Sequence, residues 1–340
     1  MADHQTLFMY GMCCDGQIEK VRLALGKGGN PNTNLGIKGL TALHVAAENN
    51  HEDVVALLLQ QPGIDVNVRD NDGRTALHCT AYNPRGSVAA ILLQQPSVDV
   101  KAPDNKGQTA LHSAVDAADP EFKYVLRVLL DHPGLDVNVT DNDGWTALHV
   151  AVYNGHDDVV ALLLDQPGID VNAADNDEER TSLHCAAREG YLGVVSLLLH
   201  QPGTNVNGAD AEGWTALHYA GCNGNEDVVA LLLEQPSIDV NAIDLDGRTA
   251  FHHACGGTDV WDNPTILRRM LTHPETDPNV NDQWQGHTPI MELLCNMLYS
   301  DGNYGNYDKQ RECWQEMLES QRFNLDVKDS DGFSLEDLIR

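Results

Sequence analysis

The sequence predicts an all-α solenoid of stacked helix-turn-helix repeats that are connected by β-hairpin-like turns. Three recurring patterns predict this fold class. The first is the tetrapeptide Thr-Ala-Leu-His, which begins at Thr41, Thr75, Thr109, Thr146 and Thr215. The second is Asp-Val-Asn followed by Asp-Asn-Asp-Gly, clearest in residues 65–73 and 136–144, and the third is Leu-Leu-Leu-x-Gln-Pro, as in residues 57–62. One short unit repeated along a chain is typical of solenoids.

The residues of the unit explain each of its elements in chain order. Thr stands where the first helix begins, and its hydroxyl can cap the free backbone N–H groups there. Leu43, Ala46 and Ala47 show the helical spacing of inward-facing residues. Asn-Gly, as at 154–155, ends the first helix, and a proline such as Pro62 prevents the second helix from continuing. Because one unit cannot bury its own apolar face, neighbouring units must stack.

This unit resembles the ankyrin repeat, whose pattern is a turn with Gly, then Thr-Pro-Leu-His, then two short helices. The resemblance covers essentially the whole chain, although Ala replaces Pro in most copies and most units are one residue longer than the family's usual unit. Three regions are expected: a degenerate N-terminal capping repeat in 1–38, seven ankyrin repeats in 39–285, and an insertion-bearing C-terminal repeat with a capping stub in 286–340. Insertions are expected near 116–120, 256–263 and 300–309, as tolerated drift or as binding loops.

The charge balance limits the classes of partner. The chain has 21 Lys and Arg against 51 Asp and Glu, a net charge of −30. Nucleic-acid binding needs clustered cations that neutralise phosphates, so we expect neither nucleic acid nor an anionic membrane surface as the partner. The acidity fits two interpretations, namely solubility of an exposed repeat array or electrostatic steering of a basic partner.

Localisation is inferred from three features of the sequence. No apolar stretch is long enough to span a membrane, and the N-terminus lacks a basic region followed by an apolar run. The eight cysteines form no CxxC pair, which indicates reduced thiols. We therefore expect a cytoplasmic monomer, with the nucleus left open.

The chemistry-bearing residue types are explained by the repeat. Seven of the 15 histidines are the repeat histidine, for which we expect hydrogen bonds to the unit's own Thr and to a neighbouring turn backbone. The Asp-Asn-Asp-Gly runs resemble calcium loops, but the position six residues after Gly73 is Cys79 rather than Glu, so a solvated turn is expected. We find no phosphate loop or nucleophile elbow. The sequence therefore predicts no catalytic residue, metal or cofactor, and a chain that is not an enzyme.

The resemblance implies that a partner protein or peptide contacts the turn tips and the exposed face of the first helices. Trp and Arg, which dominate binding hot spots, gather on that surface together with Tyr. The candidate partner-binding residues are Trp145, Tyr153, Arg180, Arg188, Trp214 and Tyr219. If they bind, an extended peptide with acidic and aromatic side chains is the natural ligand. The alternative is that the tryptophans pack on neighbouring turns and make the stack rigid.

The sequence thus predicts a protein–protein interaction scaffold. The alternative function is a substrate-recruiting or inhibitory subunit of a larger enzyme complex, for example a ubiquitin ligase adaptor. The resemblance also implies a modification, because the asparaginyl hydroxylase that acts on hypoxia-inducible factor modifies the turn Asn of many animal ankyrin proteins. The matching residues are Asn67, Asn138, Asn172 and Asn241. The alternative for them is a structural role in the hairpin.

Overall fold

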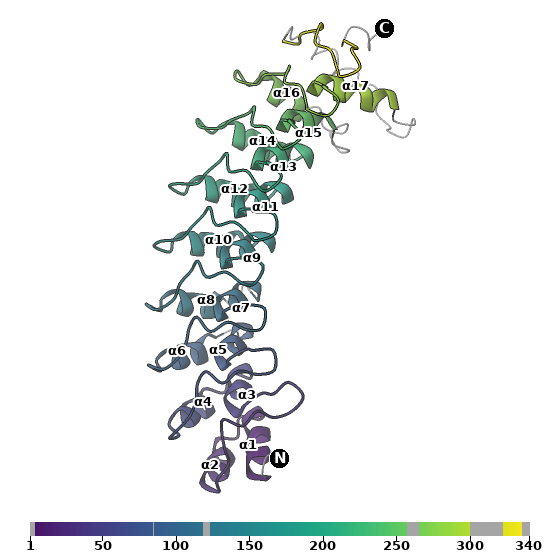
Figure 1. Cartoon of the computed structure of the whole chain (residues 1–340). Coiled ribbons are helices and arrows are strands. Elements are labelled where there is room, and N and C mark those ends of the chain that lie inside the picture. Colours follow the sequence, from purple (N-terminus) through teal and green to yellow (C-terminus); the bar gives the residue numbers. More distant parts are fainter. Residues whose placement is uncertain (1–3, 84, 118–122, 257–264, 300–321, 335–340) are drawn as a thin grey trace. The chain divides into compact units, whose positions relative to one another are not determined.

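A computed structural model describes the chain except for residues 1–3, 84, 118–122, 257–264, 300–321 and 335–340 (Figure 1). The chain divides into two compact units, Met1–Asp170 and Val171–Arg340, and each is considered by itself. The expected boundaries of the capping repeats, after 38 and after 285, stay predictions.

The first unit is a succession of short helices in pairs. Its elements are α1 (His4–Cys14), α2 (Ile18–Gly26), α3 (Ala42–Glu48), α4 (Glu52–Leu59), α5 (Ala76–Cys79), the 3-10 helix η1 (Thr80–Tyr82), α6 (Ser87–Leu93), α7 (Ala110–Asp116), α8 (Lys123–Leu130), α9 (Ala147–Tyr153) and α10 (Asp157–Leu164). Two short helices, α1 and α2, lie within residues 1–38, where the sequence predicts a degenerate first repeat.

The second unit repeats the same pairing. Its helices are α11 (Ser182–Glu189), α12 (Leu192–Leu199), α13 (Ala216–Cys222), α14 (Glu226–Leu233), α15 (Ala250–Gly256), α16 (Thr265–Thr272) and α17 (Pro289–Tyr299). The expected insertions fall largely or wholly outside the described residues, as does the end of the predicted C-terminal stub. Within the described parts of both units, the fold class is the all-α repeat architecture that the sequence predicts.

Helices of the same kind stack on one another within each unit. The first helices α3, α5, α7 and α9 contact one another in order, and so do the second helices α4, α6 and α8 (Figure 1). In the second unit α11, α13, α15 and α17 form one row and α12, α14 and α16 the other. Leucines such as Leu43 and Leu217 and alanines such as Ala46 and Ala220 are almost fully buried between the rows. Small alanines allow the close approach of helices that this stacking needs.

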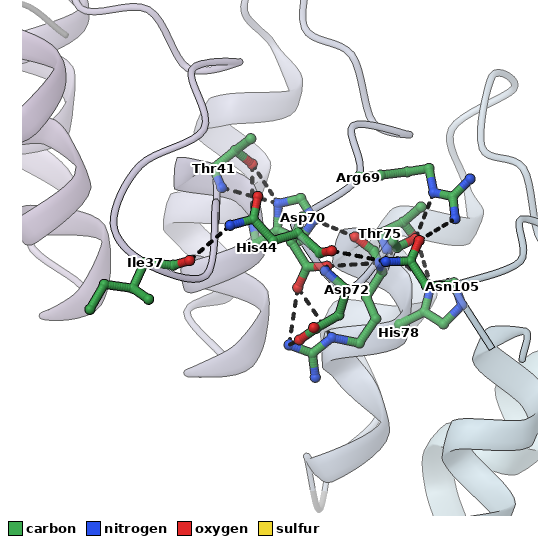
Figure 2. A network of polar contacts seen from close by, with 12 residues as sticks. Ile37, Thr41, His44, Arg69, Asp70, Asp72, Thr75, His78 and Asn105 are labelled. Carbon is green, nitrogen blue, oxygen red and sulfur yellow. Dashed lines mark hydrogen bonds and ion pairs between the residues drawn. The ribbon is translucent and has the colours of Figure 1, made fainter. Parts of the chain in front are cut away.

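Where a first helix begins with the Thr-x-x-His motif, Thr and His close its start by a reciprocal cap. In α3 the backbone N–H of Thr41 donates to Nδ1 of His44 at 3.2 Å, and the Thr41 hydroxyl accepts from the His44 backbone (Figure 2). Nε2 of His44 then donates to the carbonyl of Arg74, in the next turn, at 2.9 Å. The structural role that we expected for the repeat histidine is therefore confirmed.

Five of the other repeat histidines form the same kind of contact with the following turn, at distances of 2.8 to 3.1 Å. They are His78, His112, His184, His218 and His252. Because Nδ1 accepts from the Thr backbone, the proton lies on Nε2 and the ring is neutral. Burial lowers the pKa of all of these imidazoles.

The first Asp of the Asp-Asn-Asp-Gly run organises the turn from inside. Oδ1 of Asp70 accepts the backbone N–H groups of Asp72 at 2.9 Å and Arg74 at 2.8 Å, and Oδ2 accepts the Arg74 guanidinium at 3.0 Å (Figure 2). Asp70 is only 6% exposed, and Asp244 in the second unit 5%. The expectation of a solvated turn is therefore wrong for this residue, because its carboxylate replaces water as the acceptor for the turn's own N–H groups.

Candidate functional site

The six candidate partner-binding residues belong to both units. Trp145 and Tyr153 lie in the first unit, whereas the other four lie in the second. The two groups are therefore considered separately. All six lie in turns or on first helices, which are the elements where the sequence places them.

In the first unit, Trp145 and Tyr153 form an aromatic pair. Their ring centroids are 5.3 Å apart with the rings tilted by 64°, an edge-to-face arrangement that aromatic pairs favour. Tyr153, on the last turn of α9, is 56% exposed, and Trp145 is partly exposed. The backbone of Trp145 is fixed, because its N–H donates to Asp141 at 2.9 Å and its carbonyl accepts from His112 at 3.0 Å. The pair therefore presents aromatic surface from a rigid support.

In the second unit, Trp214 lies between two other rings. Its centroid is 5.0 Å from that of Tyr219, on its own first helix α13, and 4.2 Å from that of His253, on the next first helix α15. Trp214 thus packs against the neighbouring repeat. This contact agrees with the alternative in which a tryptophan makes the stack rigid.

Two turn carboxylates hold the rings beside Trp214. The Tyr219 hydroxyl donates to Oδ2 of Asp210 at 2.7 Å, and Nε2 of His253 lies 2.6 Å from Oδ2 of Asp244. Burial raises the pKa of Tyr219, and the neighbouring carboxylate of Asp210 raises it further. For Asp244, burial alone would raise the pKa, but the contact with His253 and backbone hydrogen bonds lower it overall. The aromatic group is therefore anchored by the same aspartates that organise the turns.

The two candidate arginines already face carboxylates. Arg180 Nη1 lies 2.8 Å from Glu178 and its Nε 3.5 Å from Asp175. Arg188 Nε lies 3.0 Å from the carboxylate of the adjacent Glu189. These ion pairs offset the positive charge that a ligand with acidic side chains would need. The expected ligand is a peptide with acidic and aromatic side chains. The contacts of the arginines thus support its acidic side chains less than its aromatic ones.

Sequence reasoning missed His253 and the two turn aspartates as members of this group. The signal was present in the column four residues after the repeat Thr, where Tyr219 and His253 stand in adjacent repeats. Residues in one column of a stacked array are neighbours. Comparing columns between repeats, rather than scanning within them, would have placed His253 beside Trp214.

The hairpin asparagines, which are the candidates for hydroxylation, connect consecutive repeats. The Asn67 amide donates to the carbonyl of Ser97 at 2.7 Å and accepts from the backbone N–H of Asp99 at 2.9 Å. Asn138, Asn172 and Asn241 each make the corresponding pair of contacts. The NH2 group and the oxygen of each amide thus both form hydrogen bonds that connect consecutive hairpins. Hydroxylation stays a prediction, which mass spectrometry of peptides from the cellular protein would check.

We call each such contact between consecutive hairpins a joint. One joint is formed by an ion pair instead of by an Asn amide. Lys101 occupies the Asn position, and its ammonium group lies 3.3 Å from the carboxylate of Asp136, where both side chains are about half exposed. An exposed ion pair contributes at most about 1 kcal/mol. The hairpins on either side of Lys101 are therefore joined more weakly than those joined by Asn.

Substitutions at these joints should change stability in opposite directions. We expect Asn67→Ala to lower the free energy of unfolding by about 1–3 kcal/mol, because it removes two hydrogen bonds between hairpins. We expect Lys101→Asn to raise it by about 1 kcal/mol, because an amide there can bridge to the next hairpin. Urea denaturation followed by circular dichroism measures both changes. A stabilised Asn67→Ala variant or a destabilised Lys101→Asn variant would contradict this assignment.

In the parts of the chain that the structure describes, no three His, Cys, Asp or Glu side chains are grouped as a metal ion would require. None of the helices in those parts of the chain is long and apolar enough to cross a bilayer.

Comparisons with known proteins agree with the geometry. The family model described as "Ankyrin repeats (3 copies)" matches residues 8–104, 86–175, 123–210 and 174–244. The crystal structure of the ankyrin repeat domain of Bcl-3, a member of the IkappaB protein family, is similar with a TM-score of 0.60 and 31% identity, covering 68% of this chain and 99% of that one.

A curated relative is similar over one short segment. The SMC5-SMC6 complex localization factor protein 1 of Bos taurus is 60% identical over 37 residues, which are 11% of this chain and 4% of the relative. The matches to the family model together run from residue 8 to residue 244, well over half of the chain. The chain belongs to the ankyrin-repeat family.

Proposed function

We propose that the chain binds a partner protein or extended peptide on the surface formed by its turns and first helices. The observation that carries this proposal is the aromatic pair of Trp145 and Tyr153, whose rings are 5.3 Å apart and partly open to solvent on a fixed backbone. Rigid aromatic side chains are common binding hot spots, since they lose little conformational entropy on binding. The family supports the same general function, because ankyrin repeats generally mediate protein–protein interaction.

The ligand proposed for this surface presents apolar or aromatic side chains. The ion pairs of Arg180 and Arg188 with adjacent carboxylates argue against a ligand that depends on acidic side chains. Face-to-edge contacts on Trp145 and Tyr153 require no ligand charge. Long-range attraction would instead favour a partner that is basic as a whole, given the net charge of −30.

The proposal also covers the state of the protein in the cell. We propose a cytoplasmic monomer that binds without catalysing a reaction. Cys13, Cys14, Cys79, Cys185 and Cys222 are free thiols, which is typical of reducing compartments. A net charge of −30 opposes the approach of a second copy.

Removing the tryptophans should release the partner. We expect Trp145→Ala combined with Trp214→Ala to weaken binding by at least about tenfold, because each substitution removes a large apolar contact. The measurement is an unbiased affinity pull-down with the full chain, read by quantitative mass spectrometry. Trp145→Ala alone is informative as well, because Trp145 has no described ring contact outside its own repeat, whereas Trp214 packs on His253.

The matched control is Tyr124→Ala, since Tyr124 is an aromatic residue, 60% exposed, on the second helix α8. The control should retain the partner. If both tryptophan variants fold and retain it too, the tryptophans only make the stack rigid and the proposal fails. Recovery of a complete set of enzyme subunits in fixed proportion would favour the alternative, a recruiting or inhibitory subunit.

A further inference from the structure

Three turns of the second unit carry large apolar side chains in solvent. Leu245 is 66% exposed, Trp284 79% and Phe333 54%. We call these three residues the tip stripe. Single exposed apolar residues are ordinary on protein surfaces, whereas a group of large ones marks an interaction site.

The turns that carry the tip stripe are consecutive and hydrogen-bonded to one another. The backbone N–H of Gln283 donates to the carbonyl of Asp246 at 2.8 Å, and the N–H of Ser330 donates to the carbonyl of Gln285 at 2.7 Å. These bonds connect the Leu245 turn to the Trp284 turn, and that turn to the Phe333 turn. The three turns that carry the stripe therefore follow one another along the second unit.

The fold does not require an apolar residue at the position of Leu245. In two turns of the first unit the equivalent position is Asn, and the amide joins the turn to the preceding one: Asn71 donates to the carbonyl of Ile37 at 2.8 Å, and Asn105 donates to that of Asn71 at 2.9 Å. A leucine side chain has no group that could form such a bond. At Leu245 a structural contact is thus replaced by exposed apolar surface, which only a binding partner would remove from water.

The charges around the tip stripe are mostly negative. Asp246 and Asp331 are exposed in these turns and Glu212 in the turn before them, against one exposed cation beside the described part of the stripe, Lys328. The whole chain carries a net charge of −30, so its field also attracts cations. A ligand that complements this surface would combine apolar side chains with positive charge.

We propose that the tip stripe docks a partner segment in which bulky apolar side chains alternate with Lys or Arg. The apolar side chains cover Leu245, Trp284 and Phe333, and the cations face Asp246 and Asp331. A second copy of the chain does not fit, because it would bring the same acids and the same net charge to the contact. The inference rests on the proposed function and adds to it a second surface, with a ligand of defined chemistry.

The test uses a random peptide library displayed on phage and selected against the full chain. Enriched peptides are synthesised with a fluorescent label, and their Kd is measured by fluorescence anisotropy. The test variant is Leu245→Ser combined with Trp284→Ser. The matched control is Ile37→Ser, which removes an apolar side chain that is 98% exposed from a turn of the first unit.

We expect enriched peptides that combine Leu, Phe or Trp with Lys or Arg. The Kd should rise by at least about tenfold for the double variant and stay unchanged for the control. Added salt should weaken binding, because it screens the contacts between the cations and the acids.

Three results would overturn the assignment: no enriched peptide, enrichment of acidic peptides, or equal Kd values for the double variant and the wild type. A dimer that dissociates in the double variant, detected by analytical ultracentrifugation, would overturn it in favour of a second copy. Peptides that depend on Trp145 and Trp214 but not on the tip stripe would also overturn it, while the proposed function would stand.

Discussion

Acidification from about pH 7 to about pH 4 is expected to reduce the free energy of unfolding by roughly 6 kcal/mol through two buried histidines alone. Burial lowers the pKa of His218 from 6.5 to about 4, and that of His252 likewise. Both rings are almost fully buried, at 0% and 2% exposure, so solvent screens them little. Each then contributes about 3 kcal/mol to the loss.

The direction of this effect follows from proton uptake. As the pH falls below 6.5, the imidazoles of the unfolded chain bind protons, while those of the folded chain stay neutral down to about 4. The unfolded state therefore binds more protons in this window and gains stability relative to the folded state. A protonated Nδ1 would also face the Thr215 N–H, which in the folded state donates to it at 3.1 Å.

Urea denaturation at several pH values, followed by circular dichroism, measures the loss. His218→Ala should be less stable than the wild type at neutral pH, but should lose about 3 kcal/mol less on acidification. His200→Ala is the control, because His200 lies exposed at the end of α12. A His218→Ala variant with the same pH dependence as the wild type would contradict the assignment.

Gly213→Ala is expected to destabilise the chain by about 2–5 kcal/mol. Gly213 has a φ of +83°, in the left-handed region, where an L side chain costs about 1–2 kcal/mol. A Cβ atom there would lie 2.8 Å from Cα of Asp244 and 3.0 Å from the backbone N of Leu245. Because the obstacle is backbone of the next turn, relief requires moving the turns apart, and overpacking of this kind costs about 1–3 kcal/mol more.

The chain contains a matched control that separates the cost of the close approach between turns from the cost of the positive φ. Gly203 has a φ of +88°, but a Cβ atom there would have no heavy atom within 4 Å. Gly203→Ala should therefore show the backbone cost alone, about 1–2 kcal/mol. The urea midpoints of the two variants give the comparison. Equal losses would mean that the close approach of the two turns contributes nothing.

The sequence predicts the fold well because one set of local rules recurs in every copy. Thr before a helix, Asn-Gly after it and Pro after the next helix each act within a few residues, so their repetition leaves few alternatives. The histidine contacts were also predictable, since a turn of the next unit follows each helix at a constant spacing. The fold of a repeat array can be predicted from its sequence because many weak local signals agree.

The contacts of the candidate site were harder to predict, because they depend on stacking. Nothing within one repeat shows that Trp214 lies 4.2 Å from His253, since the distance depends on how α13 and α15 are oriented. The ion pair of Arg180 with Glu178 depends on a local irregularity. The turn there is one residue longer, and Glu179 takes the positive φ, 55°, that glycine takes in other turns.

The asparagine joints have a consequence for how such a chain changes in length. An amide that bonds only to backbone N–H and carbonyl groups, as Asn67 does, accepts almost any side chain at the positions it contacts. Copies of the unit can therefore be duplicated, deleted or exchanged during evolution without a matching change in the neighbouring copy. The joint of Lys101 with Asp136 lacks this freedom, because it needs a carboxylate on the other side. At that joint, recombination between copies would separate two residues that must be inherited together.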